Sequence, residues 1–393
     1  MSPRDPSAPL AGRKALVLGA GVAGLSAACA LRGVGADVEI LEQAAEITEV
    51  GAGLQISPNG VRVLRALGID PHDLGDPAEA VELRDMSGRL VTRLALPADP
   101  GFYLCHRADL IAALERAARA QGVHVQLLQR VEKVTLNPDG AEVITAVGAH
   151  HATGLLIGAD GLHSRLRPVL NGAAAPFFTG QVAWRAVIPG DGGAPVAQVF
   201  MGPGRHLVSY PLRAGRLRNI VAVQECDTWA AEDWNHPDDP AALREAFARF
   251  GGPVPGWLAA VDTLFLWGLF RHPVARHWTD GAGRAALLGD AAHPTLPFMA
   301  QGANMALEDA ATLARCLAAT PDDPAQALAR YGTQRAPRTR AIVQAANRNA
   351  KAYHLRPPFA SVAHGILRLG GALAPGAALR RFRWIYDFDA TRD

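Results

Sequence analysis

The stretch that most constrains the fold is RKALVLGAGVAGLSAACALRGVGADVEILE, residues 13–42. Its pattern predicts a strand over residues 14–18, a glycine-rich turn, a helix over 22–31 and a second strand over 37–41. Two strands joined through a helix run parallel and lie in one sheet. The chain is therefore expected to begin with an α/β domain built on a parallel sheet.

The glycines of this stretch have the spacing of a dinucleotide site. Gly19 allows the tight turn, Gly21 lets the backbone approach a pyrophosphate, and Gly24 permits close packing of helix on strand. Glu42 follows the second strand and can accept a hydrogen bond from a ribose hydroxyl. These features predict a Rossmann-type site. The carboxylate disfavours a 2′-phosphate, which favours NAD or FAD over NADP, and the motif does not separate those two.

Composition narrows the class of protein. The chain has 393 residues, 49% of them hydrophobic, which is enough for two or three packed units. Its 39 Lys and Arg nearly balance 37 Asp and Glu and do not cluster, so we expect small-molecule partners and no nucleic acid. No stretch reaches the ~18 uninterrupted apolar residues of a membrane span. We expect a cytoplasmic monomer or homodimer with reduced cysteines and no metal site.

Two further glycine and acid motifs follow the first. GLLIGADGLHSRLR, residues 154–167, predicts a buried strand followed by an Asp-Gly turn. RAALLGDAAHPTLP, residues 284–297, predicts a strand followed by a Gly-Asp turn. A helix is then expected from Gly302 to about residue 318. Its N-terminus carries unpaired N–H groups and the positive end of the helix dipole, which suits an anion or an electron-rich ring.

The three motifs in this order resemble the single-component FAD-dependent aromatic hydroxylases, the class A flavoprotein monooxygenases. The resemblance runs along nearly the whole chain and is strongest for the branch of salicylate hydroxylase, 3-hydroxybenzoate 6-hydroxylase and 6-hydroxynicotinate 3-monooxygenase. The segments that carry it are EVGAGLQISPNGVRVLRALG (49–68), HRADL (106–110), GQVAWRAVIP (180–189) and HLVSYPL (206–212).

The resemblance implies a non-covalent FAD and assigns residues to it. Arg107 would lie along the cofactor, Asp290 would bond its ribityl chain, and Asp160 with Arg167 would serve both FAD and the visiting nicotinamide nucleotide. The backbone N–H groups of the helix that opens at Gly302 would face the negative charge of the reduced flavin. The residues implied to bind FAD are Gly19, Gly21, Gly24, Glu42, Arg107, Asp160, Asp290, Gly302, Ala303 and Asn304.

The resemblance also implies a reaction. NADH or NADPH reduces the flavin, O2 adds to form a C4a-hydroperoxide, and its distal oxygen is transferred to an aromatic ring. A phenol reacts well only as its proton leaves, so a base is needed beside its hydroxyl. His206 and Tyr210 are the candidates, because they lie four apart on an expected strand and share one face, and a matching His and Tyr line the pocket in this branch. The sequence leaves open whether His206 is the base or only orients the substrate.

The expected substrate is a small phenolic or hydroxy-heteroaromatic acid. Pro297 and Phe298 make one corner apolar where some members of the branch have a polar residue, so the individual substrate is open. Arg185 and Arg205 are candidates to receive a carboxylate, although solvated arginines are the more common case. A non-carboxylated aromatic substrate, an epoxidase and an FAD-binding protein without hydroxylase activity stay open. An NAD-dependent dehydrogenase would leave the second and third motifs unexplained.

The expected fold class is α/β, α+β overall. A discontinuous Rossmann-type FAD-binding domain is interleaved with a mainly antiparallel substrate-binding sheet and followed by C-terminal helices. The predicted segments are 1–75, 100–175 and 272–345 for the FAD-binding domain, 76–99 and 176–271 for the sheet, and 346–393 for the helices.

Overall fold

The computed structural model describes residues 7–47, 53–227, 236–373 and 376–392. The first four residues of the 49–68 segment lie outside the described residues. No helix in the described part of the chain is long and apolar enough to cross a membrane.

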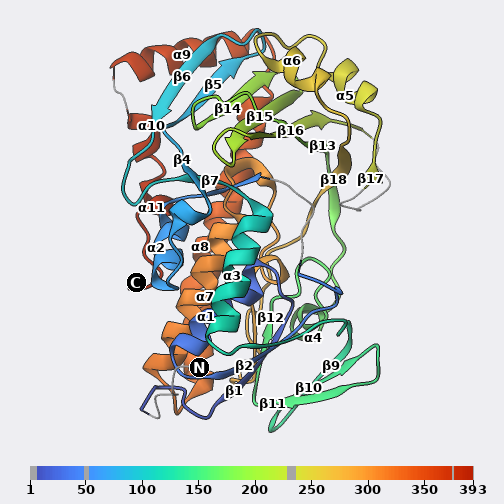
Figure 1. The fold of residues 1–393 in the computed structure, drawn as a ribbon, viewed down its shortest axis with the longest axis vertical. Helices are drawn as coiled ribbons and strands as arrows, with labels where there is room; N and C mark the ends of the chain where they lie inside the picture. Colours follow the sequence, from blue (N-terminus) through green and yellow to red (C-terminus); the bar gives the residue numbers. More distant parts are fainter. Residues whose placement is uncertain (1–6, 48–52, 228–235, 374–375, 393) are drawn as a thin grey trace.

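A five-stranded parallel sheet forms one end of the molecule (Figure 1). The helix α1 (Val22–Gly33) connects β1 to β2, so the predicted βαβ unit is confirmed, with the helix extending two residues beyond the expected end. The strands, in sheet order, are β19 (Ala285–Leu287), β12 (Leu155–Gly158), β1 (Lys14–Leu18), β2 (Asp37–Leu41) and β8 (His124–Gln126).

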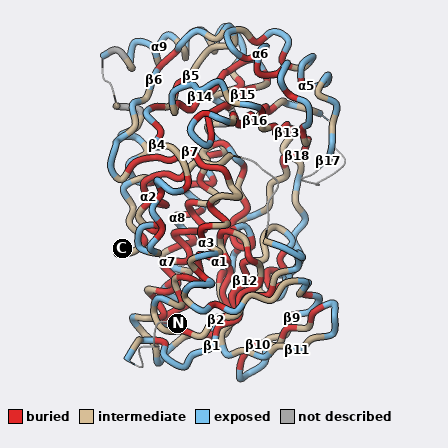
Figure 2. The backbone as a smooth tube through the Cα atoms, in the orientation of Figure 1, coloured by how far each residue is buried: buried red, intermediate tan, exposed pale blue. Residues whose placement is uncertain are grey.

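Buried helices pack beside this sheet. α1 lies against both α3 (Arg107–Ala120) and α7 (Gly302–Ala319), and α7 also packs against the long helix α8 (Pro324–Tyr353). Figure 2 shows that these helices and the central strands contain many of the buried residues. The small residues of α1, such as Ala27 and Ala28, are fully buried and allow the helices to approach closely.

An eight-stranded sheet forms the other end of the molecule (Figure 1). Its pairs are antiparallel except for β14 with β5. The chain segment 76–99 contributes a hairpin, as expected from the sequence. The strands, in sheet order, are β17 (His236–Pro237), β18 (Phe265–Arg271), β13 (Phe177–Pro189), β16 (Leu217–Glu225), β15 (Arg205–Leu212), β14 (Val196–Gly202), β5 (Ala80–Asp85) and β6 (Leu90–Ala95).

Smaller elements complete the fold. One three-stranded sheet has the order β11 (His150–Thr153), β10 (Gly140–Thr145), β9 (Val131–Asn137), and the other has the order β3 (Gly53–Ile56), β7 (Tyr103–His106), β4 (Gly75–Pro77). The remaining α-helices are α2 (Pro58–Ala66), α4 (Leu166–Asn171), α5 (Pro240–Ala246), α6 (Val254–Ala259), α9 (Phe359–Leu373), α10 (Ala377–Arg380) and α11 (Arg383–Tyr386). The domain boundaries stay a prediction, and α8 runs unbroken through residue 345, where one of them was placed.

A fully buried ionic cluster joins α7 to α8. Arg335 on α8 donates to Glu308 at 2.6 Å and to Asp309 at 2.7 Å, and all three side chains have no exposed surface. Arg338 also donates to Glu308. Charges removed from water are tolerated only when they are paired and hydrogen-bonded. The cluster therefore fixes how the two helices sit against each other.

Arg335→Ala is expected to lower the free energy of unfolding by about 3–5 kcal/mol, because it removes a buried positive charge from two buried carboxylates, Glu308 and Asp309. Arg383→Ala is the control, since Arg383 pairs with Asp387 on the surface and such pairs contribute about 0–1 kcal/mol. Urea unfolding of both variants measures the difference. Similar losses in the two variants would contradict the assigned role of the cluster.

Candidate active site

One cavity of about 1020 Å³ is lined both by the glycine and acid motifs and by one face of the large sheet. This volume is at the upper end for small-molecule sites. The sequence-predicted residues that line it are Gly19, Gly21, Glu42, Arg107, Asp160, His206, Tyr210, Asp290, Pro297, Phe298, Gly302 and Ala303. Of the ten residues that the resemblance implies for FAD binding, Gly24 and Asn304 do not line it.

The three glycines of the first motif serve different purposes. Gly19 has a φ of +93°, and a Cβ there would lie 2.6 Å from the carbonyl oxygen of Ala159. A Cβ at Gly24 would lie 1.9 Å from the carbonyl oxygen of Gly19, so Gly24 is required for the packing of α1. A Cβ at Gly21 would meet no atom within 4 Å, although Gly21 lines the cavity. The protein itself does not need a glycine there, whereas a pyrophosphate against the backbone would.

The two carboxylates nearest this turn are held by backbone N–H groups. Glu42 accepts from the backbone of Ala20 at 2.7 Å and of Ala44 at 2.9 Å. Asp160 accepts from the backbone of Arg165 at 2.7 Å through Oδ2, while its buried Oδ1 has no hydrogen-bond partner among the described residues. Burial raises the pKa of Asp160 despite these hydrogen bonds. An unpartnered oxygen at the cavity fits a site for a polar ligand.

Arg167 joins the second and third motifs. Its guanidinium donates to the backbone carbonyl of Ala291 at 3.1 Å and to that of Pro273, and it does not line the cavity. The predicted contact of Arg167 with a nucleotide stays a prediction. In the structure this residue positions the Gly-Asp turn next to the Asp-Gly turn.

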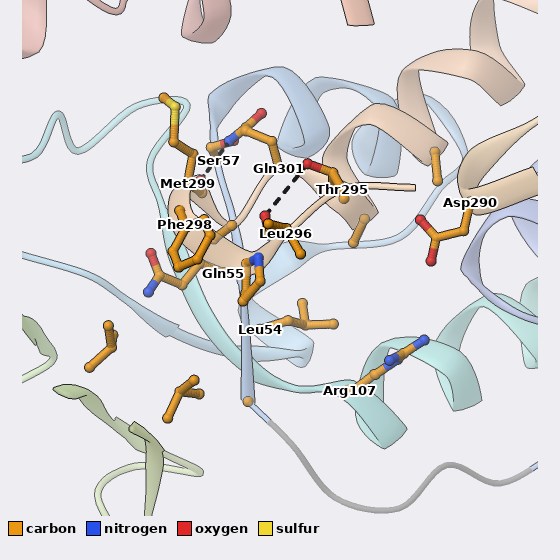
Figure 3. Close-up of a pocket in the computed structure, with 18 of the residues that line it drawn as sticks. Leu54, Gln55, Ser57, Arg107, Asp290, Thr295, Leu296, Phe298, Met299 and Gln301 are labelled. Atoms are coloured by element: carbon orange, nitrogen blue, oxygen red, sulfur yellow. Dashed lines mark hydrogen bonds between the residues drawn. The ribbon is translucent and has the colours of Figure 1, made fainter. Parts of the chain in front are cut away.

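Asp290 and Arg107 lie at one end of the view in Figure 3, with Phe298 and Met299 toward the other. Asp290 is exposed to the cavity, and the protein around it raises the pKa of its carboxyl group by desolvation. The positive charge of Arg107 acts in the opposite direction. A hydrogen-bonding acid with a nearby arginine can hold the polar chain of a nucleotide cofactor.

The helix α7 begins at the cavity. Gly302 and Ala303 line the cavity, and the first N–H groups of a helix have no partner within it. Asn304 is fully buried: its Oδ1 accepts from the backbone of Ser57 and its Nδ2 donates to the carbonyl of Gln55, both at 3.0 Å. Its side chain thus holds the segment of β3 and α2. Any contact of Asn304 with a cofactor would be through its backbone.

His206 and Tyr210 occupy the sheet side of the cavity. Both lie on β15, and Val208 between them also lines the cavity, so the predicted common face is observed. Both side chains are buried, which lowers the pKa of His206 well below its usual value and raises that of Tyr210. His206 is therefore a neutral base and Tyr210 a protonated donor at neutral pH.

Pro297 and Phe298 form an apolar part of the wall. Phe298 is buried, and its ring centroid lies 5.8 Å from that of His206. Leu296 lines the cavity beside them. This surface suits the face of an aromatic ring and offers it few hydrogen bonds.

Of the two arginines proposed to receive a carboxylate, only one lines the cavity. Arg185 lines the cavity, with its guanidinium 3.7 Å from the ring centroid of Trp267. Arg205 donates to the backbone carbonyl of Ala246 and does not line the cavity. Arg185 lies within a strand-like run and Arg205 directly precedes one, so residue type and local pattern did not distinguish them.

Sequence reasoning missed Tyr353 and His354 at the end of α8. Tyr353 lines the cavity, and burial raises its pKa to about 12. His354 accepts or donates a hydrogen bond at 2.7 Å with His206, from which it is 148 residues distant in the chain. No local spacing signals such a contact. His293, which follows the Gly-Asp turn of the third motif, is fully buried against Asp309 and does not line the cavity.

A family model described as an FAD binding domain matches residues 13–346. The chain belongs to the FAD-dependent aromatic hydroxylases. It is 36% identical to 3-amino-4-hydroxybenzoate 2-monooxygenase of Streptomyces cremeus, over 86% of this chain and 87% of that one. It is 33% identical to 3-hydroxybenzoate 6-hydroxylase of Polaromonas naphthalenivorans (95% and 96%) and 32% identical to 6-hydroxynicotinate 3-monooxygenase of Bordetella bronchiseptica (85% and 90%).

Solved structures have the same architecture. Klebsiella pneumoniae HpxO, complexed with FAD and uric acid, superposes with a TM-score of 0.81 at 29% identity, over 95% of this chain and 97% of that one. A salicylate hydroxylase substrate complex gives a TM-score of 0.79 at 25% identity, with 96% of each chain covered. The predicted fold class, the FAD cofactor and the activity of a flavin-dependent aromatic monooxygenase are thereby confirmed.

Gly21→Ala and Gly24→Ala make a matched test of the FAD site. Gly21 has an extended backbone and open space beside it, so Gly21→Ala should leave unfolding by urea unchanged and weaken FAD binding about tenfold or more. Gly24→Ala should instead destabilise the fold by about 1–3 kcal/mol. Flavin retention after dialysis and unfolding curves separate the two effects. Wild-type FAD affinity in Gly21→Ala would contradict the assignment of this turn.

Proposed function

We propose that this hydroxylase uses NAD(P)H and O2 to hydroxylate a small phenolic or hydroxy-heteroaromatic acid. The observation that carries the proposal is the single cavity that has Gly21 and Asp290 in one part of its wall and His206 and Tyr210 in another. A cofactor held by the first set would share an enclosed space with a substrate held by the second. Groups confined in this way react as if at very high local concentration.

FAD, when bound, supplies oxygen activation, with a hydride taken from NAD(P)H. The residues that would hold it are those of the glycine and acid motifs, with Glu42 at the ribose and Asp290 at the ribityl chain. The N–H groups at the start of α7 and the helix dipole would stabilise negative charge beside Gly302 and Ala303. These residues bind and orient, and the walls of the cavity exclude water from the reacting groups.

His206 is proposed to take the proton of the substrate hydroxyl. Its Nδ1 bonds to His354, which leaves Nε2 as the nitrogen available to a substrate. Because its pKa lies well below 6.5, the ring is unprotonated and able to act as a base from neutral pH down into the acidic range. Tyr210 keeps its proton, since burial raises its pKa, and is proposed to donate a hydrogen bond to the substrate.

Arg185 is proposed to bind the carboxylate of the substrate. Arginine pairs well with carboxylates, and stacking on Trp267 restricts the side chain and lowers the entropy cost of binding. The apolar wall at Phe298 would hold the ring. The relatives named for hydroxybenzoate and hydroxynicotinate hydroxylation support an acid of this class.

The function is tested with the purified holoenzyme and four aromatic acids: 3-amino-4-hydroxybenzoate, 3-hydroxybenzoate, 6-hydroxynicotinate and salicylate. NADH and NADPH oxidation is followed with and without each acid, and products are identified by mass spectrometry. At least one acid should stimulate oxidation and gain one oxygen atom. Oxidation that yields only hydrogen peroxide with every acid would contradict the proposal.

His206→Ala is expected to bind FAD and oxidise NAD(P)H, because neither step uses this side chain. Hydroxylated product should fall by about 10²–10⁴-fold while hydrogen peroxide rises, since the base that activates the phenol is lost. His150→Ala is the control, because His150 lies exposed on β11, away from the cavity. Wild-type coupling in His206→Ala would show that this histidine does not act on the substrate.

Arg185→Gln is expected to raise the KM for the carboxylated substrate about 10- to 100-fold, because a charge-assisted hydrogen bond to the carboxylate is lost. The KM for the corresponding phenol without the carboxylate should change little. Arg271→Gln is the matched control, because Arg271 also lies over an aromatic ring, that of Phe177, and does not line the cavity. An equal rise in the KM for both substrates would show that Arg185 shapes the cavity and does not bind the carboxylate.

A further inference from the structure

A chain of three hydrogen-bonding side chains leads from the cavity to the surface. His206 Nδ1 lies 2.7 Å from His354 Nε2, and His354 Nδ1 lies 3.1 Å from Glu225 Oε1. His206 lines the cavity, whereas His354 lies behind it and does not. The side chain of His354 is 2% exposed and that of Glu225 is 43% exposed. The three groups therefore connect a buried nitrogen at the cavity to solvent.

The carboxylate at the outer end sets the proton positions along this chain. Glu225 can only accept, so His354 carries its proton on Nδ1 and its Nε2 is an acceptor. That acceptor faces His206 Nδ1, which must then carry the proton of the second ring. His206 Nε2 is left unprotonated, and it forms no hydrogen bond with any described residue. This is the tautomer that a base facing the cavity requires.

The surroundings keep both rings neutral. Burial lowers the pKa of each histidine, and the charge of Arg205 lowers that of His354 further, while Glu225 acts in the opposite direction. Phe298 and Tyr353 are the other rings beside His206, and Tyr353 is itself protonated. Because both pKa values are lowered, His206 and His354 do not retain a proton that they take up. The carboxylate of Glu225, which also pairs with the exposed Arg356, is the next acceptor.

We propose that His354 and Glu225 relay the proton that His206 takes from the substrate to solvent. This inference rests on the proposed function, because His206 has a proton to pass on only if it is the base. The substrate O–H bond breaks as His206 Nε2–H forms, the Nδ1 proton moves to His354 Nε2, and the Nδ1 proton of His354 moves to Glu225 and then to water. No electrons are transferred. A proton that returns along the same path to the product oxygen restores both tautomers.

The relay is tested with Glu225→Gln, which keeps the size of an exposed side chain and removes its ability to accept a proton. His354→Gln is the second variant, because an amide can still bond to His206 but cannot carry a proton onward. Glu115→Gln is the control, since Glu115 is a partly exposed carboxylate that bonds to Arg119 on α3. The substrate is whichever of the four acids named above the wild-type enzyme hydroxylates fastest. Product, peroxide and NAD(P)H oxidation are measured across pH, with and without sodium formate.

Glu225→Gln should lower the hydroxylation rate about tenfold, because an amide replaces the carboxylate that accepts the proton, and FAD binding should be unchanged. Formate should restore much of the rate in Glu225→Gln by accepting the proton in its place. Wild-type coupling and pH profile in both variants would overturn the relay, and so would a loss that formate does not restore. If the wild-type enzyme hydroxylates none of the acids, the proposed function fails and not the relay alone.

Discussion

The paired charges of Arg335, Glu308 and Asp309 hold together the elements on which the cavity depends. Asp309 reaches in two directions, because it bonds to Arg335 on α8 and also accepts from the backbone of Gly289 at the Gly-Asp turn. A buried carboxylate needs several hydrogen-bond donors. Because the donors to Asp309 come from the Gly-Asp turn and from α8, this carboxylate fixes both elements relative to α7. The N-terminus of α7 opens at the cavity, where the buried side chain of Asn304 holds β3 in place.

The cavity has two kinds of wall, to which we assign different parts of the proposed chemistry. The wall proposed for the cofactor is built from backbone turns, where glycines provide room and the start of α7 provides N–H groups. The wall proposed for the substrate is built from side chains on one face of a sheet, where alternation places His206, Val208 and Tyr210 together. Burial on that face lowers the pKa of His206 and raises the pKa of Tyr210. His206 is therefore a neutral base, and Tyr210 is a protonated donor.

Much of this was predictable because it is encoded locally. The strands, turn and helix of the first motif follow from the spacing of apolar residues and glycines, and the structure reproduces them within two residues. The common face of His206 and Tyr210 follows from the period of a strand. The apolar corner at Phe298 was visible from residue type alone. Residue type did not reveal that Arg167 bonds to two backbone carbonyls or that Asn304 bonds through its side chain to Gln55 and does not line the cavity.

The sequence by itself determined the fold class, the FAD motifs and the family, because these depend on residues close together in the chain and on the order of three short motifs. Only the tertiary structure decided which arginine lines the cavity and which residue bonds to His206. Arg185 lies over the ring of Trp267, whereas Arg205 bonds to the backbone of Ala246. His354 meets His206 because the end of α8 packs against the large sheet, and a contact across 148 residues has no signature in local spacing.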